Sequence, residues 1–262
     1  MLKAKAVLIG LTYWVTGQTN VPGIFPGSGA SPPSQPNVLA PVKQVSPLLP
    51  PGIDLPSLQR HAQAITVKVW ADDVWGSGIL IQQQGGRYWV LTNQHVLWMG
   101  KTYRVQTPDG RMHIASLVPG VRFGNNDLGL LKFSSPARYT VATLGSSLRL
   151  PMGTPVFAAG FPVPIEFEDK GLQFTTGQIS LIMPKAFDGG YQVGYSNTIE
   201  KGMSGGPLLN RQGEVIGVNG IHQAPLWGNP YVFQDGSTPD LDWDSLARSS
   251  WAIPIETVRR HL

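Results

Sequence analysis

Hydrophobic and polar residues alternate in many short segments between about residue 64 and residue 255. Alternation among β-branched and aromatic residues is typical of strands with one buried and one exposed face. Turn residues such as Gly85-Gly86 separate the segments, as hairpins require. The expected strands fall into two runs, Ile65–Trp70, Gly78–Gln82, Tyr88–Thr92, Tyr103–Thr107, Met112–Val118 and Leu128–Phe133, then Pro155–Ala159, Leu172–Met183, Gln192–Ser196, Pro207–Asn210, Glu214–Val218 and Trp251–Ile255.

This pattern predicts an all-β fold. Two runs of six short strands indicate two packed six-stranded antiparallel β-barrels, at about residues 62–135 and 150–255, within a domain spanning residues 58–262. The pattern also predicts a C-terminal helix at Ile255–Leu262. Glu256 stands in its first turn and Arg259 near its end, which matches the helix dipole.

The first 57 residues differ from the rest. Lys3 and Lys5 precede the apolar run Ala6–Val15, a layout typical of a secretory signal peptide at residues 1–17 and too short to span a bilayer. Ten of the 23 prolines lie in the first 59 residues. Proline cannot donate to a strand ladder, so residues 18–57 are expected to be a disordered linker. We expect an exported protein, periplasmic or secreted and bacterial, that meets a membrane only if the N-terminal segment stays uncleaved.

Composition and charge narrow the function. A hydrophobic fraction of 42% can fill a core, and the absence of Cys excludes disulfides, thiol catalysis and cysteine-ligated metals. The net charge is +4, and the basic residues are scattered, so we expect no nucleic-acid partner. The acidic run near Asp240 lacks the Gly and Glu of a calcium loop. We expect neither a metal nor a cofactor.

Three segments carry candidate chemistry. His95 follows a strand in Thr92-Asn-Gln-His, Asp127 begins Asp-Leu-Gly-Leu-Leu, and Ser204 lies in Gly202-Met-Ser-Gly-Gly-Pro. A Ser hydroxyl needs a neighbouring base, imidazole suits that transfer at neutral pH, and a carboxylate can orient the ring. Gly202 and Ser204 could supply the two amides of an oxyanion hole, and the glycines after Ser204 could let a substrate backbone approach.

In the order His, Asp, Ser, these motifs resemble the chymotrypsin/trypsin fold of serine peptidases. The segments Gly76–Ile79 and Trp251–Val258 resemble those of bacterial Deg/HtrA-type proteases, and the resemblance covers about residues 64–262. It implies a serine endopeptidase that cleaves protein or peptide substrates through an acyl-enzyme intermediate. His95 would be the general base, Asp127 the orienting acid and Ser204 the nucleophile, with Gly202 and Ser204 forming the oxyanion hole.

Two departures from that family refine the expectation. Met203 stands where activatable trypsin-like zymogens carry an Asp that pairs with a newly cut N-terminus. Methionine cannot form that ion pair, so we expect an oxyanion hole that forms without cleavage. No PDZ-like domain is expected after Leu262, and the oligomeric state is not predicted.

The substrate preference stays open between two classes. Thr198 lies six residues before Ser204, where an Asp would hold a basic side chain, so cleavage after Lys or Arg is disfavoured. Glutamyl endopeptidases are similar in this loop and hold acidic side chains with a His on the next strand, whose place Asn219 takes. A small or aliphatic preference is the other reading. The residues expected to line the primary pocket are Thr198, Val218, Asn219, Gly220 and His222.

Residues 223–249 form a long insertion before the last strand. Such loops are usually functional, and we expect this one beside the pocket entrance, with solvated acids around an aromatic cluster that packs on itself. The cluster would comprise Trp227, Tyr231, Phe233 and Trp243.

Two other functions remain as alternatives. One is a catalytically inactive binding protein with a protease fold. The other is an α/β-hydrolase-type esterase, because Gly202-Met-Ser204-Gly-Gly206 also fits a nucleophile elbow, followed by Asp244 and His261. The elbow requires a helix directly after the Ser, whereas Gly-Gly-Pro favours a turn and a strand.

Overall fold

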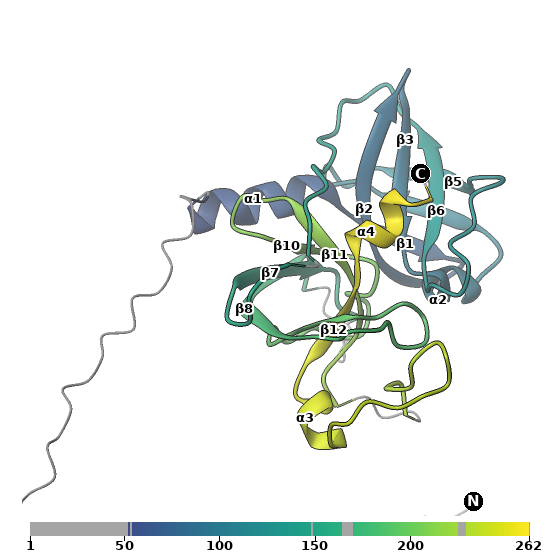
Figure 1. The fold of residues 1–262 in the computed structure, drawn as a ribbon. Helices are drawn as coiled ribbons and strands as arrows, with labels where there is room; N and C mark the ends of the chain where they lie inside the picture. Colours follow the sequence, from purple (N-terminus) through teal and green to yellow (C-terminus); the bar gives the residue numbers. More distant parts are fainter. Residues whose placement is uncertain (1–51, 53, 148, 164–169, 225–228, 262) are drawn as a thin grey trace, which may run out of the picture. The chain divides into compact units, whose positions relative to one another are not determined.

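Two closed antiparallel β-barrels form the domain in the computed structural model, which describes residues 52, 54–147, 149–163, 170–224 and 229–261 (Figure 1). The strand order is β1-β2-β3-β6-β5-β4 in the first barrel and β10-β11-β12-β9-β8-β7 in the second. The first barrel contains β1 (Thr66–Ala71), β2 (Val74–Gln84), β3 (Arg87–Thr92), β4 (Tyr103–Gln106), β5 (Met112–Leu117) and β6 (Gly129–Ser134). The second contains β7 (Pro155–Gly160), β8 (Gln173–Ile182), β9 (Val193–Tyr195), β10 (Pro207–Leu209), β11 (Val215–Ile221) and β12 (Ser250–Pro254).

The predicted chymotrypsin-like fold class is confirmed, and each of the twelve expected strands is present. Most boundaries differ by one or two residues, and β2 differs most because it begins at Val74 rather than Gly78. Val74 pairs with Ala71 across a tight hairpin in which Asp72 has a φ of 50°. The hairpin also brings the rings of Trp70 and Trp75 within 4.7 Å, so apolar packing extends the strand through the turn.

Four helices accompany the barrels, namely α1 (Leu55–Ile65), α2 (Gln94–Trp98), α3 (Trp243–Ala247) and α4 (Ile255–Arg259). The helix α4 confirms the predicted C-terminal helix. The other three were not predicted. In particular, α1 begins inside the expected linker of residues 18–57 and before the expected domain start at 58.

The start of α1 has a local cause. Asp54 caps the helix by accepting a hydrogen bond from the Ser57 amide at 2.9 Å, and Pro56 lies in the first turn, where its missing N–H costs nothing. The error came from assigning Pro56 to the linker. The signal peptide expected at 1–17, and the linker up to residue 51, lie outside the described residues. None of the helices in the described part of the chain is long and apolar enough to span a bilayer.

The apolar core has three parts. Each barrel encloses its own cluster, and a third, larger cluster joins the barrels. Leu58 and Ile65 of α1 belong to this third cluster together with Leu209 and Val215 of the second barrel. The helix therefore packs against both barrels. On the same helix, the ring nitrogen Nε2 of His61 lies 3.1 Å from the Gly213 carbonyl oxygen.

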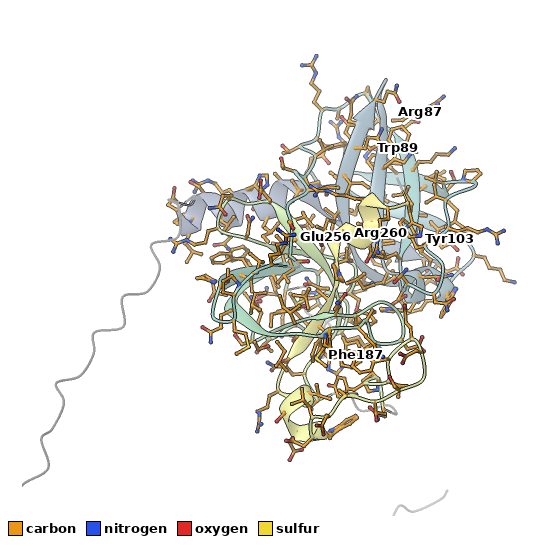
Figure 2. The ribbon with its side chains drawn as sticks, viewed as in Figure 1. Arg87, Trp89, Tyr103, Phe187, Glu256 and Arg260 are labelled. Atoms are coloured by element: carbon orange, nitrogen blue, oxygen red, sulfur yellow. The ribbon has the colours of Figure 1, made fainter. Side chains whose placement is uncertain are left out.

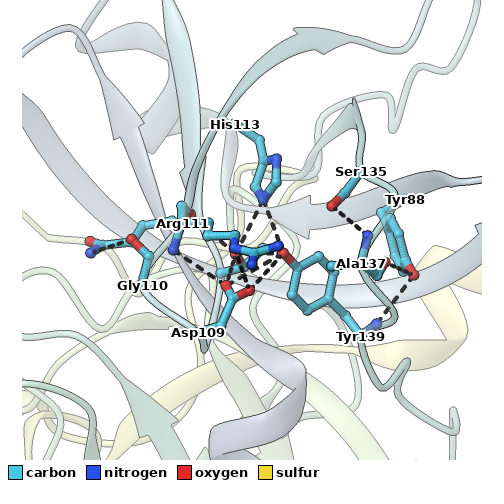
Figure 3. Close-up of polar contacts among 10 residues, drawn as sticks. Tyr88, Asp109, Gly110, Arg111, His113, Ser135, Ala137 and Tyr139 are labelled. Atoms are coloured by element: carbon cyan, nitrogen blue, oxygen red, sulfur yellow. Dashed lines mark hydrogen bonds and ion pairs between the residues drawn. The ribbon is translucent and has the colours of Figure 1, made fainter.

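Polar contacts fix two further regions. Glu256 of α4, labelled in Figure 2, accepts hydrogen bonds from Ser146 and Ser147 in the segment that connects the barrels. In the first barrel, the Tyr88 hydroxyl donates to the Ala137 carbonyl at 2.9 Å and accepts from the Tyr139 amide at 3.1 Å (Figure 3). These bonds hold the chain segments that leave β6 and precede β7.

Candidate active site

The structure brings His95 and Asp127 together as predicted. His95 lies in α2, directly after β3, and Asp127 lies directly before β6, which pairs with β3 from Thr92 to Gly129. One carboxylate oxygen of Asp127 accepts from the His95 amide at 2.8 Å, and the other contacts His95 Nδ1 at 2.5 Å. The Asn93 side chain donates to the Asp127 carbonyl at 2.8 Å. The carboxylate is thus held against Nδ1 of the imidazole, and the other ring nitrogen, Nε2, lies on the opposite side of the ring.

Burial and hydrogen bonding act in opposite directions on Asp127. Burial raises the pKa of its carboxyl, but the hydrogen bond and charge of His95 and a hydrogen bond from Tyr191 outweigh burial and hold that pKa below its ordinary value. The carboxylate is therefore ionised at neutral pH. An ionised acceptor is what an imidazole needs in order to carry a second proton during a reaction.

Ser204 lies in the loop between β9 and β10 and contacts the first barrel. Its carbonyl accepts from the Ser77 amide at 2.8 Å, and the Ser77 hydroxyl donates to the Gly202 carbonyl at 2.8 Å. The Ser204 hydroxyl donates to the Gly220 carbonyl at 3.2 Å, and the described contacts include no hydrogen bond between Ser204 and His95. A proton transfer to the imidazole would require this hydroxyl to turn away from Gly220.

The glycines after Ser204 have a structural role that differs from the expected one. Gly205 has a φ of +86°, and a Cβ there would overlap the Ser77 carbonyl and lie 3.1 Å from the Asn93 amide nitrogen. A Cβ at Gly206 would overlap the Ala159 carbonyl. We expected these glycines to admit substrate backbone, but the space they leave is filled by neighbouring strands. They let the Ser204 loop pack against the strands beside it.

The amides expected to form the oxyanion hole face no acceptor in the described chain. Gly202 has a φ of +97°, which favours glycine. The carbonyl of Lys201 accepts from the Val163 amide at 2.8 Å, and a trans peptide then turns the Gly202 N–H to the opposite side. Within the described residues neither the Gly202 nor the Ser204 amide donates a hydrogen bond. This loop therefore contains two amides without an acceptor among the described residues.

Met203 helps to hold this loop. Its side chain is buried, its amide donates to the Glu200 carbonyl at 3.0 Å, and its sulfur lies 3.3 Å from the Glu200 nitrogen. The loop is therefore fixed by local contacts of Met203, and the ion pair that an Asp at this position makes in trypsin-like zymogens is not needed to hold it. That the oxyanion hole forms without cleavage stays a prediction.

The expected pocket residues occupy different surroundings. Thr198 is exposed, His222 is half-buried, and Val218 is buried in the core. Asn219 is fully buried. Its side-chain oxygen accepts a hydrogen bond from the Tyr195 hydroxyl, and its side-chain nitrogen donates to the carbonyls of Ala159 and Pro207. The Asn219 side chain consequently supports the strand and does not reach a ligand.

Tyr191 is a residue of the site that sequence reasoning missed. Its hydroxyl donates to the same Asp127 oxygen that faces His95, at 2.5 Å. The sequence before it, Asp188-Gly189-Gly190, predicts a turn and nothing more. The signal in the sequence was the paired glycine, since Gly189 has a φ of +74° and its carbonyl accepts from the Asp127 amide.

The insertion at residues 223–249 packs on the second barrel, with Trp227 outside the described residues. Phe233 stacks on Phe187 at 5.1 Å, and Trp251 of β12 meets Phe187 edge-on at 5.0 Å. Phe187 is labelled in Figure 2. Main-chain bonds join Asp188 to Val232 and Ala186 to Gln234. The aromatic cluster packs partly on itself, as expected, since the rings of Tyr231 and Trp243 lie 4.9 Å apart. It also packs on the barrel and on the segment that leads to Tyr191.

Comparisons with known proteins agree with this geometry. The family description "Trypsin-like peptidase domain" matches residues 76–218. A serine protease Do-like HtrA of Lactococcus lactis subsp. lactis is 32% identical over 188 residues, which are 70% of this chain and 42% of that protein. The periplasmic pH-dependent serine endoprotease DegQ of Escherichia coli is 32% identical over 155 residues, 59% of this chain and 32% of that protein.

One solved structure extends the comparison to the fold. An HtrA-type protease, AlgW, with a tripeptide superposes with a TM-score of 0.59 at 21% sequence identity. The match covers 79% of this chain and 62% of that one. The chain spans less than half the length of the curated relatives named above.

Proposed function

We propose, because the chain belongs to the trypsin-like peptidase family, that it is a serine endopeptidase acting through an acyl-enzyme intermediate. The observation that carries the proposal is the ionised Asp127 held against His95 Nδ1 at 2.5 Å, beside a loop with two open amides. This arrangement leaves Nε2 of His95 for the nucleophile, which is the division of roles that acyl transfer needs.

The reaction would proceed in two halves. His95 takes the proton of the Ser204 hydroxyl while the oxygen attacks the peptide carbonyl, and the oxyanion accepts hydrogen bonds from Gly202 and Ser204. The imidazolium then gives its proton to the amine that leaves, and an acyl-serine remains. In the second half His95 takes a proton from water, hydroxide attacks the acyl carbon, and Ser204 regains its proton.

A protein or peptide substrate with a non-basic P1 side chain fits this site. Exposed Thr198 supports it, because no carboxylate stands at that position to hold Lys or Arg. The side-chain amide of Asn219 already bonds to neighbouring residues, which argues against its binding an acidic P1 side chain. Of the two residues that could take the place of the endopeptidase His, only His222 is then left for that role. Cleavage of a mixed peptide library by the purified protein, read by mass spectrometry, decides between acidic and small or aliphatic P1 residues.

Export to the periplasm or the exterior is part of the proposal. The basic and apolar layout of residues 1–17 supports it, and the DegQ relative is periplasmic by name. N-terminal sequencing of the protein recovered from a secreting bacterial host would show cleavage near residue 17. A chain recovered intact in the membrane fraction would favour an uncleaved anchor.

Labelling with a fluorophosphonate tests the enzymatic role. We expect the folded protein to be labelled at Ser204 and to hydrolyse casein, and we expect Ser204→Ala to lose both properties while keeping its circular dichroism spectrum. A folded protein that is neither labelled nor active contradicts the proposal and favours the binding-protein alternative. The fold already excludes the α/β-hydrolase, since β10 follows the Ser204 loop directly.

A further inference from the structure

We propose that Tyr191 is a positioning residue of the catalytic site, which fixes the Asp127 carboxylate through its hydroxyl so that the carboxylate in turn aligns His95. This inference rests on the proposed peptidase function. Tyr191 touches neither the imidazole nor the nucleophile in the described contacts, so it acts through Asp127 alone.

The contacts on the carboxylate define the role. The Asp127 oxygen that faces His95 Nδ1 at 2.5 Å also accepts from Tyr191 at 2.5 Å, while the second oxygen accepts from the His95 amide at 2.8 Å. Two of these three donors come from the residue that must be aligned. Tyr191 is the third donor, and it comes from the second barrel, just before β9. Without it, the carboxylate could rotate together with the ring that it orients.

Gly220 provides the space for the phenol. A Cβ on Gly220 would overlap Cε1 and the hydroxyl of Tyr191 and lie 2.6 Å from Cζ. The same Gly220 accepts the hydroxyl of Ser204 through its carbonyl. Tyr191 therefore fills the gap between the strand that contacts the nucleophile and the acid that orients the base.

The main chain holds Tyr191 and Asp127 in register. The Asp127 amide donates to the Gly189 carbonyl at 2.8 Å, and the Tyr191 carbonyl accepts from the Phe187 amide at 2.8 Å. Gly190 has a φ of +88°, and a Cβ there would overlap the side-chain oxygen of Asn126. The turn before the tyrosine thus lies directly against the residue before the acid, and main-chain hydrogen bonds join the two segments.

Tyr191 is suited to donate at every working pH. Burial, and then the negative charge of Asp127, raise the pKa of its hydroxyl well above the ordinary value. The proton stays on the phenol oxygen, and the bond to a carboxylate is charge-assisted. A donor that never ionises adds no titration to the site.

Kinetics of Tyr191→Phe test the proposal. The variant keeps the ring and removes only the hydroxyl, so we expect kcat on a peptide substrate to fall about 10-fold or more with KM within about twofold of the wild type. The matched control is Tyr88→Phe, which removes another buried hydroxyl that bonds to main chain in the first barrel. We expect Tyr88→Phe to keep its kcat even if it unfolds at a lower temperature.

Proton NMR gives a readout that does not depend on turnover. In a Ser204→Ala background, the downfield resonance of the His95 Nδ1 proton should shift when Tyr191 becomes Phe and stay in place when Tyr88 does. An unshifted resonance, or a kcat of Tyr191→Phe within twofold of wild type or of Tyr88→Phe, overturns the positioning role. A wild-type protein without peptidase activity would sink the proposed function instead, and the NMR comparison would still decide whether Tyr191 positions the pair.

Discussion

Single residues shape this site partly through the side-chain atoms they lack. Gly202 adopts a backbone conformation that turns its amide away from its neighbours, and Gly220 leaves room for the phenol of Tyr191. The two glycines lie on opposite sides of Ser204 along the chain. Their roles differ, since one frees a donor and the other admits a ring.

Gly220→Ala should therefore damage the site more than the fold. The added methyl overlaps the Tyr191 ring, and overpacking of this kind costs about 1–3 kcal/mol of unfolding free energy. We expect kcat to fall because Tyr191 is displaced from Asp127. Urea unfolding measures the change in unfolding free energy, and peptide hydrolysis measures the change in kcat.

Gly217→Ala is the control on the same strand. The nearest atoms to its added carbon lie 3.1 Å away, so its neighbours need to shift only slightly. Equal loss of kcat in both variants would contradict the role of Gly220.

Prediction from sequence works best where chemistry is local. His95, Asp127 and Ser204 each stand in a short motif whose neighbours belong to the same turn or strand. Tyr191 lies 64 residues from Asp127 and meets it only because two barrels come together. The paired glycine before it indicates a turn, but no local pattern names Asp127 as its partner. For the same reason, Asn219 was placed near the ligand from its position along the strand, although its side chain faces the core.

Among the elements, strands were easier to predict than helices. The strands have alternating or continuous apolar patterns of their own, whereas α2 and α3 contain only five residues each, too few for a helical period. The equally short α4 was predicted from the charges at its two ends. The longer α1 was missed because its proline resembled those of the preceding segment. Yet its apolar residues Leu58, Ala62 and Ile65 recur at helical spacing and are all buried.

Leu58→Ala should show that α1 is part of the domain. Leu58 is 1% exposed in the cluster shared by both barrels, and replacing a buried leucine by alanine costs about 2–5 kcal/mol. Urea unfolding should report a free-energy loss in that range.

Leu55→Ala provides the comparison within the same helix. Leu55 is 49% exposed, and we expect its replacement to change the unfolding free energy by less than about 0.5 kcal/mol. If the two variants are equally stable, α1 does not hold the barrels together.

At the scale of the whole molecule, a single carboxylate ties α4 to the segment between the barrels. Burial raises the pKa of Glu256, but hydrogen bonds from Ser146 and Ser147 outweigh burial and hold it below its ordinary value. A carboxyl with a lowered pKa in the folded state stabilises that state above its unfolded pKa. This contribution is lost as the pH falls through the folded pKa.

Glu256→Gln should accordingly be less stable than the wild type at neutral pH, and its Tm should fall less steeply below about pH 4.3, the ordinary pKa of glutamate. Thermal unfolding followed by circular dichroism at several pH values measures both effects. Ser147→Ala, which removes one donor, should lie between the two proteins. Parallel Tm curves for wild type and Glu256→Gln would contradict the linkage.

The position of β12 in the second barrel has a consequence for how the protein is made. All five residues of this strand are buried, and it lies between β11 and β9, so the barrel stays open until Pro254 has left the ribosome. A nascent chain that ends at Ser249 already contains His95, Asp127 and Ser204, but its second barrel has an unfilled gap between β11 and β9. The proposed peptidase activity is therefore expected only after residues 250–254 have left the ribosome, which delays any cleavage of neighbouring nascent chains.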